Sequence, residues 1–461
     1  MAGDRGYVER INVNRQFQPS HYREIFNVAF PVGLEAVFQA SFSLIDQVIV
    51  GTLGASAVAA VGLSNNLSFV LTLLYAAIGT GSGAFIAQAY GRRDMDEVSK
   101  IAAIGQSAAA ILGIGSSIPL ILFPSSILRC VGAQEELLKT ASVYLQLFAA
   151  SAPLTVMSAV TTATFRSMSD SRTPMAITMG SVCLNTLLAL LLVLGIGGFP
   201  KLGVAGAGLA TLISQGVRAV VLVVVLYLVK KGMRWYWPVW SIIAQIGPPL
   251  FKITYPIVFG EMLWGTSTFV YVIIFTRIST DALASSQIVT TIENLFILAV
   301  SGLAPAAVAT VGQALGVDDK AIARKQARRV LRVAIASGLI FTVALAGMSF
   351  VLPVLYPRVD KQVLNLAFWG VIIVAAVQPA KALNNVLGTG ILPSGGDTKF
   401  VLFSHIVSSY AVGLPIAAST ALLVRWSALS VFGSRAIEEL LKSALLFARY
   451  RKRAWQRELR T

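Results

Sequence analysis

The chain is poor in the residues that build metal centres and disulfide frameworks. It has two cysteines and two histidines in 461 residues. Cys130 and Cys183 lie in or near apolar segments, so the sequence predicts neither a disulfide framework nor a metal site. His21 and His405 are far apart in the sequence and form no ligand cluster. Paired acidic motifs suited to magnesium are also missing, which argues against a membrane-embedded enzyme such as a lipid transferase.

Charged residues are scarce as well, and acidic residues are the scarcest. Only 13% of the residues are charged, 56% are hydrophobic, and the mean hydropathy is +0.74. These values exclude an ordinary soluble protein. The 37 lysines and arginines outnumber the 21 acids, but they gather between apolar runs, and no folded basic domain is present to bind nucleic acid. We therefore expect an integral membrane protein without a nucleic-acid partner.

Long apolar segments divide the chain into twelve candidate membrane spans. Segments such as 101–123, 179–198 and 334–355 are long enough to cross a bilayer. The predicted spans begin near Tyr22, Ser56, Glu97, Glu136, Thr173, Gly203, Phe251, Asp281, Ala321, Val363, Lys399 and Leu429. Most lysines and arginines fall in segments that share one side, which is the positive-inside pattern. This predicts a multi-pass protein of the plasma (inner) membrane with both termini in the cytoplasm.

The second half of the chain repeats the first half at a constant displacement of 225 residues. Pro31 pairs with Pro256, and the motif Gln-Ala-x-Gly-x-x-Asp at 88–94 pairs with the same motif at 313–319. Internal duplication in so apolar a chain is typical of two-lobed transporters with a site between the repeats. The sequence therefore predicts an all-α integral membrane protein with twelve transmembrane helices in two pseudo-symmetric six-helix lobes.

The duplication also predicts how the chain divides into domains. They are a first lobe (1–232), a cytoplasmic linker (233–244), a second lobe (245–450) and a basic cytoplasmic tail (451–461). The amino-terminal stretch before the first span is polar and basic and shows no cleavable signal pattern. We expect the basic tail to contact anionic lipid head groups.

Polar residues inside the first lobe's spans are candidates for function, because charge in a membrane span is costly. Asp46 lies deep in the first span with no basic residue beside it. Glu35, Gln39, Phe42 and Asp46 share one helical face, which we expect to point into the bundle. A buried carboxylate there can take up and release a proton, although a hydrogen-bonded structural aspartate is the alternative.

The second lobe also carries charge inside its predicted spans. Glu261 follows Pro256 in the seventh span, Glu293 interrupts the eighth, and Lys381 lies in the tenth. Lys381 is expected to pair with Glu261 or with Glu293. The pattern is compatible with both a structural and a functional role for these three charges.

Several segments resemble the MATE family, the multidrug and toxic compound extrusion transporters. The first span, with Pro31, Gln39 and Asp46, and the run that follows it at 57–64 resemble the family's opening signature. Gly-x-Gly at 81–83, the loop at 166–174, the small-residue run at 203–215 and the Gly-Gly-Asp-Thr run at 395–398 follow in the family's order. The resemblance covers nearly the whole chain.

The resemblance implies a V-shaped pair of lobes that alternates between inward-open and outward-open states. It implies export of amphipathic, often cationic compounds in exchange for H⁺ or Na⁺, with no bound cofactor. Asp46 matches the family's first-helix carboxylate, Gln39 its accompanying amide, Asn185 the fifth-helix asparagine and Thr211 a sixth-helix threonine. The predicted cation-coupling residues are Asp46, Glu35, Gln39 and Asn185, and the predicted substrate-binding residues are Phe42, Thr211, Glu261 and Glu293.

Two positions depart from the family's pattern. Ala189 stands where the prokaryotic branch with an amino-lobe cation site has an aspartate, and Glu35 is a conjectured substitute for that acid. Lys381 stands near the place of an acid in the branch with carboxy-lobe sodium binding, and a fixed cation there would repel sodium.

The leading prediction is a monomeric antiporter in which a cation at Asp46 and the substrate compete for one amino-lobe pocket. The alternative is a flippase for lipids or lipid-linked sugars in the same superfamily. A groove lined by several arginines or lysines would favour the flippase, because phosphates need countercharge.

Overall fold

The protein is built from long helices that cross one another in two groups. The computed structural model describes residues 22–130, 134–423 and 427–459, and this part of the chain contains helices and no strand. The basic amino-terminal stretch and the last two residues of the predicted tail lie outside the described residues.

The first lobe contains six long helices. They are α2 (Arg23–Gly51), α3 (Ala55–Gly91), α4 (Met95–Leu122), α6 (Glu135–Ser167), α7 (Arg172–Leu194) and α8 (Val204–Val224), which continues into the π-helical segment η2 (Val225–Val229). Two short elements, α5 (Pro124–Cys130) and the 3₁₀ turn η1 (Ile196–Gly198), lie in the connections.

The second lobe contains six further spans, several of them interrupted. Three spans are single helices: α9 (Trp240–Ile278), α12 (Lys320–Ser349) and α19 (Leu429–Arg451). One span consists of α10 (Thr280–Val300) and α11 (Leu303–Gly316), and another of α14 (Lys361–Ala376), α15 (Gln378–Asn385), η3 (Val386–Ile391) and α16 (Leu392–Ser394). The sixth consists of α17 (Thr398–His405), η4 (Ile406–Gly413), α18 (Leu414–Ala418) and η5 (Ser419–Leu423). The short helix α13 (Leu352–Leu355) precedes α14.

The length and composition of these helices fit a membrane. In the described part, 10 helical spans are long and apolar enough to cross it, and α14 with α15–α16, bent by 51°, makes an eleventh. The last helix, α19, has 23 residues but carries six charges, including Glu438 and Lys442. Together these give the twelve spans, so the predicted all-α membrane fold is confirmed.

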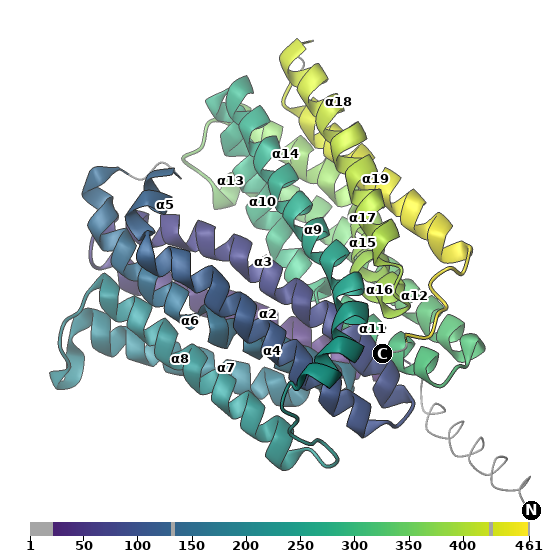
Figure 1. Cartoon of the computed structure of the whole chain (residues 1–461). Coiled ribbons are helices and arrows are strands. Elements are labelled where there is room, and N and C mark those ends of the chain that lie inside the picture. The colour runs from purple at the N-terminus through teal and green to yellow at the C-terminus, as the bar shows by residue number, and fades with distance from the viewer. Residues whose placement is uncertain (1–21, 131–133, 424–426, 460–461) are drawn as a thin grey trace, which may run out of the picture.

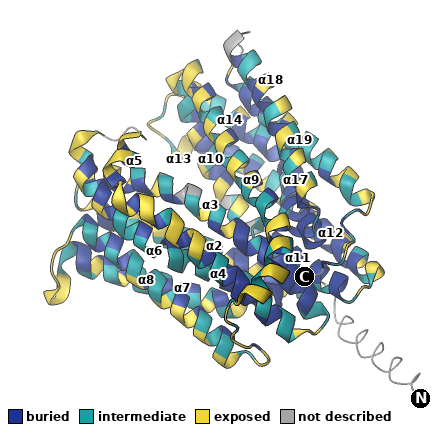
Figure 2. Ribbon diagram, viewed as in Figure 1, coloured by how far each residue is buried: buried dark blue, intermediate teal, exposed yellow. Residues whose placement is uncertain are grey.

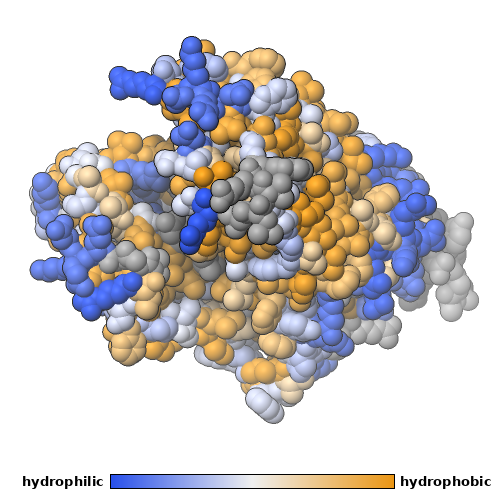
Figure 3. Space-filling model, turned by 90° about the horizontal axis from the view of Figure 1, so that it is seen from above, coloured by the Kyte–Doolittle hydropathy of each residue, from blue (hydrophilic) through white to orange (hydrophobic). Residues whose placement is uncertain are grey.

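The two lobes incline towards each other as a V (Figure 1). Buried residues gather where the lobes meet, around α11 and α12, and exposed ones lie along the outer helix faces (Figure 2). Many of these exposed side chains are apolar, such as Val48 at 70% and Val343 at 74% exposure. Broad apolar areas with polar residues gathered at their edges are visible from above (Figure 3). Such a surface suits contact with lipid.

The lobes meet at one end through the repeated motif, and we call this the closed end. A Cβ atom on Gly91 of α3 would lie 2.1 Å from the carbonyl oxygen of Gln313, and one on Gly316 of α11 would lie 2.0 Å from that of Gln88. Only glycine allows two backbones to approach so closely. Each repeat therefore places its glycine against the glutamine carbonyl of the other repeat.

The other motif residues complete this pseudo-symmetric contact. Gln88 Nε2 donates to the carbonyl of Ser394 at 2.7 Å, and Gln313 Nε2 donates to the carbonyl of Ser167 at the same distance. The motif aspartates start the next helices. Asp94 accepts a hydrogen bond from the N–H of Glu97, and Asp319 accepts from two backbone N–H groups of α12. The motif thus builds both the contact between lobes and the turn that follows.

A second feature of the closed end is Asp170, in the loop between α6 and α7. Burial opposes ionisation of Asp170, but a hydrogen bond from Lys230 at 2.6 Å and two from Thr173 outweigh it and lower the pKa of this carboxyl. A lowered pKa stabilises the fold at neutral pH, and this contribution is lost as the pH falls through the folded-state value.

The apolar residues of the described carboxy-terminal tail pack between the lobes. Leu459 N donates to Gln88 Oε1 at 2.7 Å, and Gln88 Nε2 donates to the Arg457 carbonyl at 3.1 Å. Trp455 is completely buried and stacks on Tyr450. The apolar tail residues bury because a hydrophobic surface between the lobes receives them, whereas Lys452 stays exposed.

The linker between the lobes is shorter than predicted. Helix α9 begins at Trp240, inside the predicted linker at 233–244, and runs through Pro248 and Pro249. The start predicted near Phe251 is therefore too late, and the helix continues through both prolines although proline interrupts the helical hydrogen-bond ladder. Helices at a membrane tolerate proline when neighbouring groups satisfy the freed carbonyls. The other eleven spans begin within two residues of their predicted starts.

Replacing either glycine at the crossing of α3 and α11 with valine should separate the two lobes at the closed end. Gly91→Val or Gly316→Val places two methyl groups against a carbonyl oxygen, so the lobes cannot approach as they do here. In a background without native cysteines, Ser394→Cys should react faster with maleimide in both variants, because Ser394 is completely buried at this contact. Gly347→Val is the control, since nothing lies near a Cβ at Gly347. Equal labelling rates in all variants would contradict the assignment.

The buried tail should also stabilise the closed end. Trp455→Ala removes a completely buried ring and is expected to cost about 3–5 kcal/mol of stability. The melting temperature of the purified protein should fall and labelling of Ser394→Cys should rise, whereas Lys452→Ala, at an exposed position, should change neither. A Trp455→Ala protein that melts like the wild type would show that the tail contributes nothing here.

Candidate functional site

Asp46 lies at the centre of a polar network in the first lobe. Its Oδ1 accepts a hydrogen bond from the Thr186 hydroxyl at 3.0 Å. Both polar atoms of the Asn185 amide have hydrogen-bond partners when its nitrogen faces Asp46 and donates to Oδ2 at 2.8 Å. The amide oxygen of Asn185 then accepts from Thr211 N and Ser214 Oγ, each at 3.2 Å. The structure therefore brings Asp46, Asn185 and Thr211 together, from α2, α7 and α8.

In the described part of the chain, the charge of Asp46 is not compensated by a basic side chain. Within the described residues, no lysine or arginine forms an ion pair with this carboxylate. Ala189, at the position where an acid was expected, is buried in an apolar cluster with Ile49 and Val193. Asp46 is thus a carboxylate held in place by neutral donors, which leaves its negative charge available to a proton or a cation.

Glu35 belongs to a different cluster on the same helix. It is 3% exposed, and its Oε2 lies 2.8 Å from Arg166 Nη2 while its Oε1 lies 3.8 Å from Arg218 Nη2. Gln39 Nε2 donates to Glu35 Oε1 at 3.4 Å. Eleven residues separate Glu35 from Asp46 on α2, or about 16 Å at 1.5 Å per residue. Glu35 and Gln39 therefore do not join the Asp46 network, and Glu35 does not replace the acid missing at Ala189.

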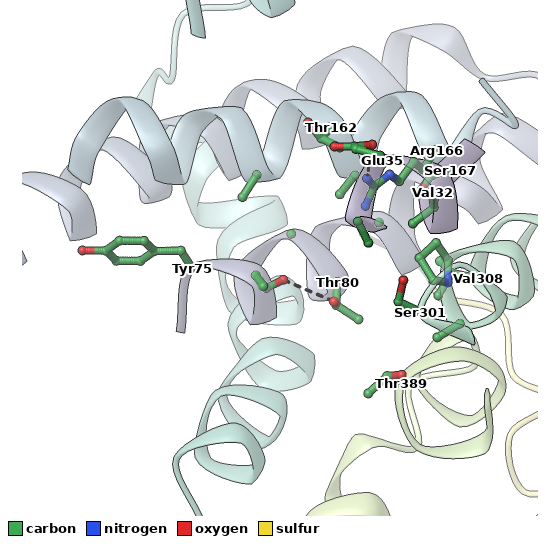
Figure 4. A pocket seen from close by; sticks show the side chains of 18 of the residues that line it. Val32, Glu35, Tyr75, Thr80, Thr162, Arg166, Ser167, Ser301, Val308 and Thr389 are labelled. Carbon is green, nitrogen blue, oxygen red and sulfur yellow. Dashed lines mark hydrogen bonds and ion pairs between the residues drawn. The ribbon is translucent and has the colours of Figure 1, made fainter. Parts of the chain in front are cut away.

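The Glu35 cluster lines a cavity between the lobes. The cavity has a volume of about 490 Å³ and is lined by α2, α3, α6 and α8 of the first lobe and by α11 and neighbouring segments of the second. Glu35, Arg166 and Thr162 lie on one side, with Ser301, Val308 and Thr389 across from them (Figure 4). This volume is within the range of small-molecule sites.

The predicted substrate-binding residues lie elsewhere. Phe42, Thr211, Glu261 and Glu293 are not among the residues that line this cavity. The Phe42 ring packs on Phe38 with 4.5 Å between their centroids. Thr211 belongs to the Asp46 network, and the two glutamates lie in the second lobe.

The second lobe holds its own buried charges. Lys381 forms an ion pair with Glu293, which is 3% exposed, so of the two expected partners Glu293 is the one it meets. Glu261 lies close enough to Lys442 for their charges to interact, and Lys442 Nζ is 3.3 Å from His405 Nδ1. These groups face each other within the lobe, as expected for charges that a membrane bundle must compensate.

Arg166 and Arg218 are the site residues that sequence reasoning missed. Arg166 was taken as part of a loop but ends α6 with its side chain at the cavity. Arg218 stands in the middle of the apolar helix α8. A lone arginine in an apolar span was a readable signal, since such a charge faces the bundle interior.

Comparison with known proteins agrees with the duplicated, two-lobed architecture. The family model of MatE matches residues 31–191 and again residues 256–418. The chain belongs to the MATE family. It is thus a membrane transporter, and the two matches coincide with its two repeats.

Individual MATE relatives align along most of the chain. A probable multidrug resistance protein NorM of Thermotoga maritima is 25% identical over 414 residues, covering 87% of this chain and 85% of the relative. The uncharacterised transporter YisQ of Bacillus subtilis is 21% identical and covers 94% of both chains. The crystal structure of a mutant of the Vibrio cholerae MATE transporter VcmN superposes with a TM-score of 0.86 at 18% identity, covering 95% of this chain and 98% of that one.

Removing one charge of the Lys381–Glu293 ion pair should destabilise the second lobe more than removing both. Lys381→Met leaves a buried carboxylate without its cation, which typically costs about 3–5 kcal/mol. The melting temperature of this MATE protein should therefore fall. The double variant Lys381→Met/Glu293→Leu removes both charges and should recover most of the loss. A single variant as stable as the wild type would contradict this account.

Proposed function

We propose that this MATE protein is a secondary active antiporter that exports amphipathic organic compounds in exchange for H⁺ or Na⁺. It would act as a monomer in the plasma (inner) membrane. The observation that carries the proposal is the Asp46 carboxylate, held by Asn185 and Thr186 in a membrane span without an ionic partner among the described residues. The relatives described as probable multidrug resistance proteins support the substrate class.

Coupling at Asp46 requires a difference in ion affinity between two states. An ion can shift the balance between inward-open and outward-open forms only by binding one of them more tightly. Asp46 accepts hydrogen bonds from Asn185 and Thr186 of α7, and Asn185 in turn bonds to α8, so neutralising Asp46 would change how α2 packs on α7. Because Glu35 lies on the same α2, a movement of this helix would reach the cavity about 16 Å away. Ion and substrate then act at two places on one helix and need not compete for one pocket.

The proposed orientation places the closed end in the cytoplasm. Exposed basic residues gather there: Arg93, Lys231, Lys325, Arg328, Arg451 and Lys452. This is the distribution that the positive-inside rule associates with the cytoplasmic face. The structure would then correspond to an outward-facing state, with the cytoplasmic side shut by the α3–α11 contact.

A flippase for a lipid or lipid-linked substrate is the second candidate. The observation in its favour is the pair of arginines at the interlobe cavity, since guanidinium groups pair well with phosphates. Vesicles can separate the two candidates, because a flippase moves labelled lipid between leaflets whereas the antiporter moves a dye across the membrane.

The proposal is tested with purified protein in liposomes. A proton gradient or a sodium gradient is imposed separately, and movement of ethidium and of a carboxylated fluorescein is followed. One gradient should drive dye movement, and Asp46→Asn should reduce that movement at least about tenfold, because the amide can neither take up a proton nor attract a cation. Asp281→Asn, which removes an acid outside the Asp46 network, is the matched control and should transport normally. Full coupled transport by Asp46→Asn would refute the role of Asp46.

A further inference from the structure

The interlobe cavity carries more positive than negative charge. Glu35, Arg166 and Arg218 are the charged members among the described residues that line it, so two guanidinium groups face one carboxylate. The side chains of Arg166 and Arg218 are 21% and 16% exposed. Charge that is largely removed from water and incompletely compensated favours a ligand of opposite sign.

The hydrogen-bonding capacity of these arginines is also incompletely used. Arg166 donates to Glu35, whereas the one ion pair of Arg218 in the described part of the chain spans 3.8 Å, longer than a hydrogen bond. The Nε atoms of both arginines and the Thr162 hydroxyl are buried and have no hydrogen-bond partner among the residues that the structure describes. Buried donors without partners are costly, and a ligand that accepts from them would recover that cost.

The remainder of the lining is apolar or weakly polar. Ala76, Ala159, Pro305 and Val308 contribute aliphatic surface, and Tyr75 contributes an aromatic ring. A ligand that fits this environment has an apolar body and one group rich in acceptor oxygens. Guanidinium forks match the planar carboxylate and the phosphate in geometry as well as in charge.

We infer that Arg166 and Arg218 form a subsite for one oxyanion, a carboxylate or phosphate, of an amphipathic substrate. Glu35 acts as the internal counter-ion when this subsite is empty. The inference rests on the proposed transport function and narrows its substrate class from amphipathic, often cationic compounds to an anionic or zwitterionic amphiphile. A purely cationic substrate would meet the excess positive charge and be disfavoured.

The test is equilibrium binding to the full-length protein in phosphatidylcholine nanodiscs, without any ion gradient. Three fluorescent probes share one apolar body and differ in the head group: pyrenebutyrate, pyrenebutanol and pyrenebutyl-trimethylammonium. The wild type should bind pyrenebutyrate roughly tenfold or more tightly than the ammonium probe. Arg218→Gln should abolish this preference and leave pyrenebutanol binding unchanged.

Two further variants keep the result interpretable if Arg218→Gln folds poorly. Glu35→Gln removes the internal counter-ion and should strengthen pyrenebutyrate binding. Arg277→Gln, at an exposed arginine in the last turn of α9, is the control and should behave as the wild type. Equal affinity of the wild type for the anionic and cationic probes, or weaker pyrenebutyrate binding in Glu35→Gln, would overturn the inference.

Lipid composition distinguishes the two sources of the oxyanion. If a lipid phosphate occupies the subsite, phosphatidylglycerol in the nanodiscs should compete with pyrenebutyrate and weaken its apparent affinity in the wild type but not in Arg218→Gln. If the substrate is a free amphiphile, affinity should be the same in both lipids. Because no gradient is used, Asp46→Asn should bind the probes normally, so failure of ion coupling would leave this result intact.

Discussion

The structure depends on one contact, the crossing of α3 and α11 at a glycine from each repeat. Gly91 and Gly316 let two helix backbones approach until each meets the glutamine carbonyl of the other. The glutamine amides then bond across the lobes, and the aspartates of the same motif begin the next helices. Seven residues, used twice, therefore fix where the lobes touch and how the chain turns beyond that contact.

This contact also determines where a site can form. Closing one end of a V leaves space between the lobes beside the contact, and the cavity of about 490 Å³ lies there, lined by helices of both lobes. The Asp46 network, in contrast, lies entirely within the first lobe. A moving α2 is the shortest physical connection between the two, since Glu35 and Asp46 both belong to it. The tail breaks the two-fold symmetry of the closed end, because its described residues bond to Gln88 and not to Gln313.

Much of this architecture could be predicted from the sequence. Apolar run length fixes a membrane helix more reliably than local propensity does, so eleven of twelve starts were close. The exception, α9, begins before two prolines that the helix tolerates. The repeated motif was visible, but its role was not, because close approach of backbones leaves no pattern besides glycine itself. The roles of the cavity residues could not be predicted in the same way, because Arg166 and Glu35 are 131 residues apart in the sequence and only the fold brings them together.

The central claim is that the closed end must separate during transport. Spin labels at Lys231→Cys and Lys320→Cys, both exposed near the contact and in different lobes, report its width in a protein without native cysteines. Double electron–electron resonance would compare this distance with Asp46 intact and replaced by asparagine, across the pH and sodium conditions that drive transport. The account predicts two distances whose populations shift with the coupling ion in the intact protein and not in Asp46→Asn. A single unchanged distance under all conditions, in a protein that transports, would contradict it.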